Sequence, residues 1–300
     1  MDGKIILGDA LTELKKLPDA RVDMCITSPP YWGLRDYGIE GQLGLEPTFQ
    51  EYIDKLCTIF DEVKRVLKPE GTCWVNLGDT YGSGKGEEGD KKKIHSLEHK
   101  KKVKGYEKCL LQIPSRFSIE MCNRGWILRN TIIWYKPNCM PSSVKDRFTV
   151  DFEYLFFFAK QKKYYFEQQF EQYTEPMNRW GGDKLKADGK STWDEGTGQD
   201  SYRDRDMRPN KEGRNKRCVW KIPTKPYKEA HFAVYPEELI TTPIKAGCPE
   251  GGIVLDPFIG SGTTGRVATS LKRNYLGIDI QDNYRCLQGK RTSNVQIELL

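Results

Sequence analysis

The chain has 300 residues, of which 37% are hydrophobic and 11% aromatic, enough for one main domain built on a buried sheet and carrying a sizeable elaboration. It has no run of 18 apolar residues and no charged-then-apolar leader at Met1, so we expect an intracellular protein that is neither secreted nor inserted in a membrane. Nine cysteines without a CxxC pair indicate reduced, mostly buried thiols rather than a disulfide framework.

The net charge of +6 is unevenly distributed. Residues 80–108 hold nine Lys against five acidic residues, and residues 160–217 hold fourteen Lys or Arg against eleven, which leaves the remainder near −1. Positive charge gathered on polar segments over a neutral body favours a partner with a phosphate backbone, although solvated Lys-rich loops are a common alternative.

The first hundred residues alternate between strand and helix patterns. Strands are predicted at Ile5–Leu7, Val22–Ile26 and Thr72–Leu77 from their apolar runs. The first two strands flank a short helix with Leu11, Leu14 and Leu17 on one face, and a second helix begins at the capping-box pattern of Thr48 and Glu51. Such alternation predicts a mostly parallel sheet with helices on both faces.

The second predicted strand runs into the sequence SPPYW, residues 28–32. Two prolines prevent further strand pairing and hold the backbone extended. Ser28 then offers a hydroxyl, Pro29 a carbonyl, and Tyr31 and Trp32 flat apolar faces. This set suits a planar heterocycle that carries an exocyclic amine, since two oxygens accept the amine hydrogens while the ring stacks. The alternative is that this Pro-Pro-aromatic sequence is an ordinary loop that only ends the strand.

Residues 78–106 are polar and Lys-rich and predict a mobile loop. This segment contains HSLEH at 95–99, which has the spacing of a zinc-peptidase motif but lies between Lys runs and lacks an evident third ligand, so we expect no metal site. Its GSGKGEE stretch lacks the spacing of a Walker loop, so ATP hydrolysis is not expected.

Further along, a helix is predicted near 112–124 and buried strands at Trp126–Tyr135 and Phe152–Ala159, joined by a loop, KPNCMPSSVKDR, suited to closing over a base. Residues 171–217 contain no Ile, Val or Phe and cannot build a core of their own. We expect this polar segment to read DNA through arginines that reach guanine edges and phosphates, the alternative being an insertion without function.

The segment IVLDPFIGSGTTG, residues 253–265, carries a GxGxxG pattern between an apolar run and a helical one. Asp256, fixed by Pro257, is expected to face the ligand, where it would repel a pyrophosphate and attract a cation such as S-adenosylmethionine. Asp256 as a simple cap of a helix at 261–272 is the alternative. Asp279 follows the short apolar run Tyr275–Ile278, where the next parallel strand would place an acid over a ribose.

These segments together resemble the β class of amino-group DNA methyltransferases, in which the target-base motif precedes the cofactor loop. ITSPPY at 26–31 resembles the N4-cytosine form of the base motif, whereas N6-adenine enzymes more often carry aspartate at the position of Ser28. Segments at 7–17, 230–240 and 276–279 resemble the remaining cofactor motifs. The segment 147–166 also resembles a segment of this family, but Phe152 stands where many members have histidine, which leaves the role of Glu153 open.

The resemblance implies an α/β, Rossmann-like, S-adenosylmethionine-dependent methyltransferase fold with permuted motif order. It implies catalytic residues that hold the base and others that bind S-adenosylmethionine. The base residues are Ser28, Pro29, Pro30 and Tyr31, and the cofactor residues are Asp9, Asp256, Pro257, Phe258, Gly260, Gly262, Thr263 and Asp279. The expected parts are a catalytic part at 1–160, a DNA target-recognition insertion at 161–218 and a cofactor-binding catalytic part at 219–300.

The implied reaction is site-specific transfer of a methyl group to the N4 amine of cytosine in double-stranded DNA, by base flipping and direct in-line displacement. C5-cytosine methylation needs a nucleophilic cysteine, and the Pro-Cys dipeptide usual in that family is absent. N6-adenine methylation stays open, and NAD-dependent oxidation and a DNA-binding module without catalysis are rivals of other classes. We expect a cytoplasmic protein of prokaryotic or phage origin, a monomer or homodimer, with a companion restriction endonuclease as a possible partner.

Overall fold

The computed structural model describes residues 3–34, 36, 38–39, 41–82, 105–172, 212–224, 235–281 and 296–298. The chain divides into two compact units, one comprising residues 1–167 and 218–300 and the other residues 168–217.

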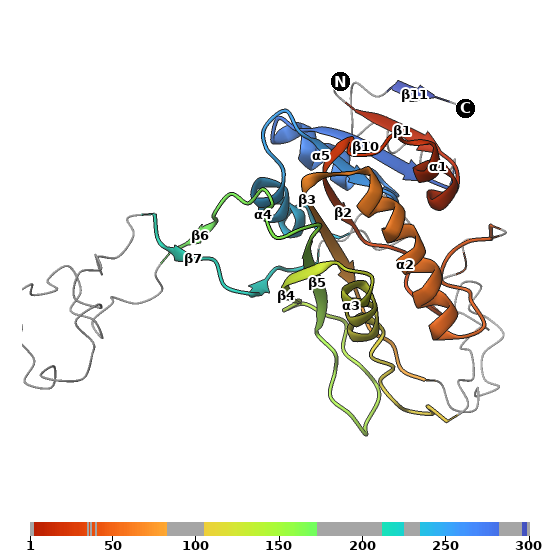
Figure 1. Ribbon diagram of the computed structural model, residues 1–300. Helices are drawn as coiled ribbons and strands as arrows, with labels where there is room; N and C mark the ends of the chain where they lie inside the picture. The colour runs from red at the N-terminus through yellow and green to blue at the C-terminus, as the bar shows by residue number, and fades with distance from the viewer. Residues whose placement is uncertain are drawn as a thin grey trace, which may run out of the picture. The chain divides into compact units, whose positions relative to one another are not determined.

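The larger unit contains a sheet of nine described strands in the order β11-β1-β10-β9-β2-β3-β5-β4-β8 (Figure 1). Only β5 runs antiparallel to its two neighbours, so the expected mostly parallel sheet is confirmed. The strands are β1 (Lys4–Leu7), β2 (Val22–Thr27), β3 (Leu67–Leu77), β4 (Ile127–Tyr135), β5 (Phe152–Ala159), β8 (Val219–Lys221), β9 (Ile253–Asp256), β10 (Asn274–Asp279) and β11 (Gln296–Glu298).

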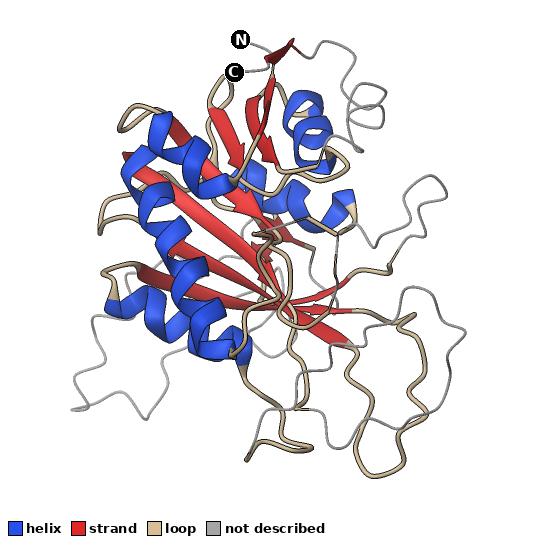
Figure 2. Ribbon diagram, turned by 90° about the vertical axis from the view of Figure 1, so that its right-hand side faces the viewer, coloured by secondary structure: helices blue, strands red, loops and turns tan. Residues whose placement is uncertain are grey.

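Five helices of the described chain cover the two faces of this sheet, which Figure 2 shows as one continuous twisted surface. On one face α1 (Ala10–Lys16), α2 (Phe49–Val66) and α3 (Ile113–Asn123) pack side by side. On the other face lie α4 (Glu237–Gly247) and α5 (Thr263–Ser270). Two helices begin at side-chain caps, because Asp9 accepts the amide of Thr12 at 2.9 Å and Thr48 accepts that of Glu51 at 3.2 Å.

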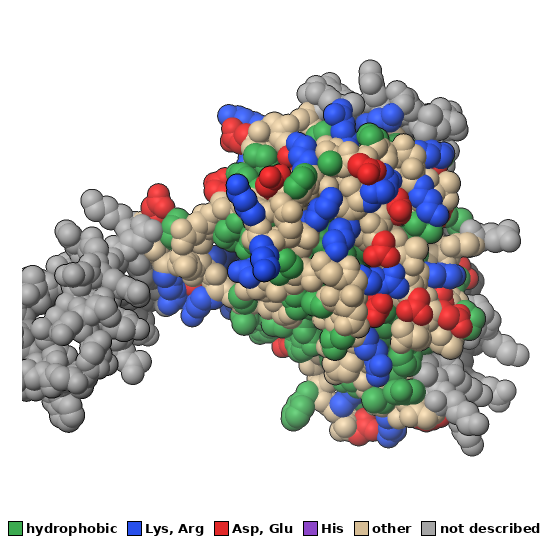
Figure 3. Space-filling view, viewed as in Figure 1, with side chains coloured by type: hydrophobic (Ala, Val, Ile, Leu, Met, Phe, Trp, Pro, Cys, Tyr) green, Lys and Arg blue, Asp and Glu red, His purple; other side chains and the backbone are tan. Residues whose placement is uncertain are grey.

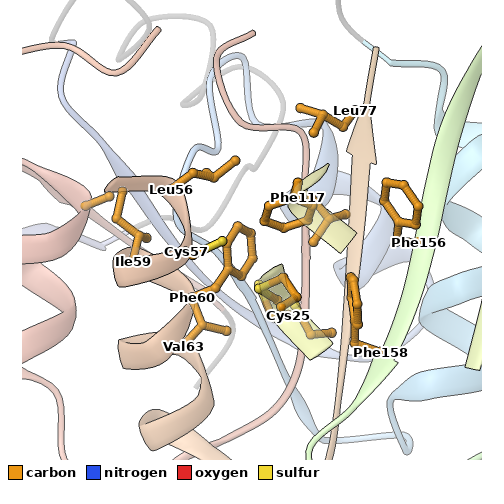
Figure 4. Packing of buried hydrophobic residues seen from close by; sticks show 14 of the residues in the cluster. Cys25, Leu56, Cys57, Ile59, Phe60, Val63, Leu77, Phe117, Phe156 and Phe158 are labelled. Atoms are coloured by element: carbon orange, nitrogen blue, oxygen red, sulfur yellow. The ribbon is translucent and has the colours of Figure 1, made fainter. Parts of the chain in front are cut away.

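The core beneath α2 is apolar and aromatic (Figure 4). Phe60 of α2 meets Phe117 of α3 edge to face at 5.4 Å, and Phe117 in turn packs on Phe156 and Phe158 of β5. On the opposite face, Trp74 and Phe157 stack in parallel at 4.1 Å. Because both faces are buried, the central strands are apolar on both sides, as parallel strands between two helical layers require.

The observed elements differ from the expected ones at several boundaries. β3 begins at Leu67, directly after α2, and its pairing with β2 jumps from Leu67 to Thr72. Pro69 and Gly71 therefore lie in an irregular stretch of this strand and not in a separate turn. β4 begins one residue later than expected and α5 spans 263–270 within the expected 261–272, while α4 and β8 were not predicted.

The ends of the expected mobile loop at 78–106 are held in place. Gly82 donates to the Cys109 carbonyl at 2.9 Å, and Tyr106 packs edge to face on Phe49 at 5.4 Å. The HSLEH sequence and the rest of 83–104 lie outside the described residues.

In the smaller unit the described residues are 168–172 and 212–217. Its strands β6 (Phe170–Glu171) and β7 (Arg214–Asn215) pair antiparallel, and Glu171 binds the guanidinium groups of Arg214 and Arg217 at 2.8 and 2.6 Å. Residues 161–167, which we expected in the insertion, belong to the larger unit, where Glu167 donates its amide to the Ala246 carbonyl at 2.8 Å.

Neither a membrane span nor a metal cluster occurs in the described part of the chain. It contains no helix long and apolar enough to cross a membrane, and no group of three or more His, Cys, Asp or Glu side chains that could hold a metal ion. Of the eight described cysteines, all unpaired, Cys25, Cys57, Cys73 and Cys248 are buried, whereas Cys109 and Cys122 are exposed, so the expectation of mostly buried thiols holds for only half of them.

Candidate active site

One edge of the sheet collects the residues that the sequence singled out. The parallel strands β1, β10, β9, β2 and β3 all end at this edge, and the antiparallel strand β5 begins there. A cavity of about 1260 Å³ opens at these strand ends. Ligands of open α/β sheets bind at this kind of edge, outside the carboxyl ends of the strands.

The glycine segment forms one wall of the cavity through Pro257, Phe258, Gly260 and Thr263. Gly260 and Gly262 have φ values of +49° and +85°, which glycine adopts at little cost. Gly262 is the N-cap of α5 and is not among the residues lining the cavity. Its role is therefore to turn the backbone into the helix.

Asp256 lies beneath this loop and not on the cavity wall. It is 1% exposed, and its oxygens accept hydrogen bonds from the hydroxyl groups of Thr27 at 2.6 Å, Tyr235 at 3.1 Å and Thr264 at 2.5 Å, and from the Phe258 amide at 3.1 Å. Burial raises the pKa of the Asp256 carboxyl above its ordinary value, although these hydrogen bonds oppose the shift. The expectation that this carboxylate faces the ligand is corrected, because neutral hydroxyl donors enclose it.

Other carboxylates do line the cavity. Asp9 follows β1, Asp279 is the last residue of β10, and Asp54 lies on α2. Burial raises the pKa of Asp279 to about 6, against the opposing effect of a hydrogen bond from the Gln281 amide at 2.8 Å. The two cationic residues of the lining, Lys55 and Lys136, are each paired with another lining carboxylate, Glu46 at 3.4 Å and Glu153 at 2.7 Å. The cavity therefore has an excess of negative charge.

Ser28, Pro29, Pro30 and Tyr31 follow β2 and line the same cavity. The Pro30 carbonyl accepts a hydrogen bond from Tyr52 of α2 at 2.8 Å, which fixes the turn from below. Trp32, which we expected to offer a flat face to a ligand, is instead 4% exposed. Its indole donates to the Glu46 carbonyl at 3.1 Å and packs on Phe49.

A polar cluster that the sequence did not predict surrounds the Tyr31 hydroxyl. This hydroxyl donates to Glu153 at 2.7 Å and lies 3.2 Å from the side-chain oxygen of Asn76, whose amide nitrogen also bonds Glu153 at 3.2 Å. Lys136 binds the other oxygen of Glu153 at 2.7 Å. Burial and the nearby Glu153 carboxylate raise the pKa of Tyr31 well above its ordinary value, so its hydroxyl is a neutral donor.

Strand register brings this cluster together. Leu77 pairs with Tyr154 and Trp134 pairs with Glu153, so the end of β3, the end of β4 and the start of β5 meet beside Tyr31. In the sequence, Lys136 directly follows one predicted strand, and Glu153 lies at the start of the next. Antiparallel pairing of these two consecutive strands would have predicted that the two residues lie close together.

The expected cofactor segment at 230–240 is described from Tyr235 onward, since residues 230–234 lie outside the described part. Tyr235 lines the cavity while its hydroxyl binds Asp256. Burial and the nearby Asp256 raise the pKa of this tyrosine well above its ordinary value.

Comparison with known proteins agrees with this arrangement. Residues 22–288 match the family N6_N4_Mtase, described as DNA methylase. The chain is 41% identical over 289 residues to the Type II methyltransferase M.XycI of Xanthomonas campestris pv. cyanopsidis, covering 95% of this chain and 85% of that protein. It is 39% identical over 293 residues to the Type II methyltransferase M.SmaI of Serratia marcescens, covering 96% and 90%.

Solved structures share the fold at lower identity. The PvuII DNA methyltransferase (cytosine-N4-specific) superimposes with a TM-score of 0.66 at 19% identity, covering 97% of this chain and 86% of that one. The putative DNA modification methylase TTHA0409 of Thermus thermophilus, complexed with S-adenosyl-L-methionine, gives a TM-score of 0.59 at 21% identity and 99% coverage of both chains. The chain thus belongs to the N6_N4_Mtase family of DNA methylases, the amino-group methyltransferases that include these Type II enzymes.

Proposed function

We propose that this DNA methyltransferase transfers a methyl group from S-adenosylmethionine to the N4 amine of cytosine in double-stranded DNA. One observation carries the proposal: the sequence Ser28-Pro29-Pro30-Tyr31 and residues 257–261 and 263 of the glycine segment line a single cavity. A base held by the first and a methyl donor held by the second would meet within it.

The charge of the cavity supports S-adenosylmethionine as the donor. Asp9, Asp54 and Asp279 leave the cavity wall negative, which disfavours the pyrophosphate of a dinucleotide and favours a cation. When bound, S-adenosylmethionine supplies an electrophilic methyl group on a positively charged sulfur, open to direct displacement. Asp279 is the candidate acceptor for ribose hydroxyl groups, Asp9 for the adenine amine, and Phe258 the apolar contact for the adenine ring.

The chain's own contribution is to orient the base amine. In our proposal the Ser28 hydroxyl and the Pro29 carbonyl accept the two amine hydrogens, which turns the nitrogen lone pair away from the ring and toward the donor. No donor among the described residues bonds the Pro29 carbonyl, whereas that of Pro30 is taken by Tyr52. The Tyr31 ring stacks on the base, while Glu153 and Asn76 hold its hydroxyl.

Cytosine is favoured over adenine because position 28 is a neutral serine. This preference agrees with the PvuII enzyme, which is described as cytosine-N4-specific. Adenine N6 is the second candidate, since the family includes both kinds of enzyme and both bases present the same kind of amine.

Double-stranded DNA is the proposed partner, with residues 168–217 reading the sequence. On the face shown in Figure 3, Lys and Arg side chains alternate with Asp and Glu and form no separate basic patch. We therefore assign DNA contact to the mouth of the cavity and to the Lys- and Arg-rich segments at 80–108 and 160–217. The Type II names of the relatives support a companion endonuclease. Our proposal further includes action on the nucleoid in the cytoplasm, as a monomer or homodimer.

The test is to incubate DNA with the purified protein and labelled S-adenosylmethionine, digest it to nucleosides and identify the labelled product by mass spectrometry. We expect N4-methylcytosine. Recovery of N6-methyladenine alone would replace the cytosine assignment, and the Ser28→Ala variant should reduce kcat by roughly 10- to 1000-fold because it removes one of two oriented acceptors.

A further inference from the structure

The loop between β4 and β5, residues 137–150, is unusually apolar for an exposed segment. Nine large hydrophobic side chains are exposed in the described chain, and four of them lie in this loop. Phe148 is 96% exposed and Met140 is 88% exposed, the two highest values of that set, and Val144 and Val150 are each 41% exposed. A gathering of this kind marks an interaction surface rather than chance exposure.

The loop borders the proposed base site. Cys139, Met140 and Val150 line the cavity that also contains Ser28 and Tyr31. Phe148 does not itself line the cavity, but it stands two residues before Val150, which does. A partner that places one group inside the cavity and the rest across its mouth would meet this side chain.

The loop is held in place at several points. Lys136 donates its amide to the Asp151 carbonyl at 2.7 Å, which closes the base of the loop. Near the tip, Lys108 binds Asp146 at 2.6 Å and the guanidinium of Arg147 lies 3.4 Å from the centre of the Tyr81 ring. Phe148 is thus presented from an anchored backbone, which lowers the entropy lost when a partner binds it.

Charge next to the aromatic ring indicates the partner. Lys145 and Arg147 precede Phe148, and Asp146 between them is paired with Lys108, so these four charged residues leave the tip with a net positive charge. A flat apolar side chain among cations matches nucleic acid, which offers stacking faces between phosphates. A purely apolar protein partner would gain nothing from the positive charges beside Phe148.

We propose that this loop docks on the DNA duplex and that Phe148 enters the base stack at the place vacated by the flipped target base. The proposal rests on the proposed function, since a flipped base is what leaves that place empty. Withdrawing a base costs unstacking and unpairing energy, and an inserted apolar wedge recovers part of it. Met140 and Val150 would then cover the withdrawn base at the cavity mouth.

The test compares two duplexes that carry the sequence this protein modifies, identified by sequencing DNA from cells that express it. One duplex is fully paired. In the other, an abasic residue stands opposite the target base, so that the pairing is already lost. Initial methylation rates are measured for the wild type, Phe148→Ala, Phe148→Leu and a control, Ile119→Ala, which removes a 61% exposed apolar side chain from α3.

We expect Phe148→Ala to slow methylation of the paired duplex at least about tenfold and to approach the wild-type rate on the abasic duplex, because the unpairing no longer needs a wedge. Phe148→Leu should keep most of the activity, and Ile119→Ala all of it. A loss with Phe148→Ala that is equal on both duplexes, or no loss at all, would overturn the wedge while leaving the methyltransferase assignment intact. Absence of methylation by the wild type on either duplex would overturn the proposed function and the wedge together.

Discussion

The hydroxyl of Thr27 donates a hydrogen bond of 2.6 Å to Asp256 across 229 positions of sequence. Thr27 is the last residue of β2, immediately before the sequence Ser28–Tyr31 that we propose binds the base, and Asp256 is the last residue of β9, immediately before the glycine segment. This buried contact therefore sets the two halves of the site relative to one another.

Breaking this contact should weaken both folding and function. Thr27→Val keeps the shape but removes the donor, and we expect a loss of ~1–3 kcal/mol in the free energy of unfolding, because a buried carboxylate loses a partner. Thr27→Ser should retain most of it. Urea unfolding of Thr27→Val, Asp256→Asn and the double variant forms a cycle, and strictly additive effects would show that the contact is not energetically important.

The Asp279 carboxylate should lower the stability of the fold and increase the affinity for S-adenosylmethionine. Its raised pKa of about 6 means that the folded state holds the proton more tightly than the unfolded chain, whose value is about 3.9. The stability it contributes falls as pH rises from about 3.9 to about 6, and above that the buried charge exerts its full cost.

Asp279→Asn should accordingly raise the free energy of unfolding at pH 7.5 by ~1–3 kcal/mol and weaken S-adenosylmethionine binding by roughly tenfold. The affinity for S-adenosylmethionine is measured by calorimetry between pH 5 and 8. Wild-type affinity should decline as pH falls through about 6, whereas the Asn variant should lack this step. A pH-independent wild type would contradict the assigned role.

Tyr31 offers a way to separate stacking from hydrogen bonding. Tyr31→Phe keeps the ring but removes the hydroxyl that contacts Glu153 and Asn76, so we expect only a modest decrease in kcat. Tyr31→Ala also removes the ring and should reduce activity by a further factor of about ten or more, as loss of a base-stacking side chain costs ~1–3 kcal/mol. Equal activities of the two variants would exclude stacking as its main contribution.

Glu153 and Lys136 should contribute to stability mainly through the ion pair between them. Both side chains are less than one-fifth exposed, at 18% and 17%, so Glu153→Gln leaves a largely buried ammonium group without its counter-charge. We expect this single change to cost ~1–3 kcal/mol of stability. The double variant Glu153→Gln with Lys136→Gln should recover part of that loss in the same thermal unfolding assay, and a double variant less stable than either single one would refute the pairing.

The smaller unit should be removable. β6 and β7 pair through Phe170 with Asn215 and Glu171 with Arg214, so the chain ends on either side of residues 173–211 lie next to each other. Replacing 173–211 by a four-residue Gly-rich turn should leave S-adenosylmethionine affinity and the unfolding transition of the larger unit unchanged while abolishing sequence-specific DNA binding. Retained specificity in a gel-shift assay would assign recognition elsewhere.

Sequence patterns predicted the sheet best where the chain alternates regularly. β1, β2, β5 and β10 lie close to the expected ranges, because apolar runs bounded by turn residues determine short buried strands. The three-residue strand β8 and the helix α4, which contains Pro243, gave weaker local signals. Their positions depend on packing against elements distant in sequence.

By itself, the sequence determined that the proposed site residues come together, since Ser28, Pro29, Tyr31, the glycine segment and Asp279 each follow a predicted strand and so lie at one edge of a parallel sheet. Only the tertiary structure decided which way each side chain points. It turned Asp256 and Trp32 inward, where hydroxyl groups and apolar neighbours surround them, and brought Glu153, Asn76 and Lys136 to Tyr31. The physical reason is that local patterns fix the alternation of a strand, whereas burial and hydrogen-bond partners depend on which strands become neighbours.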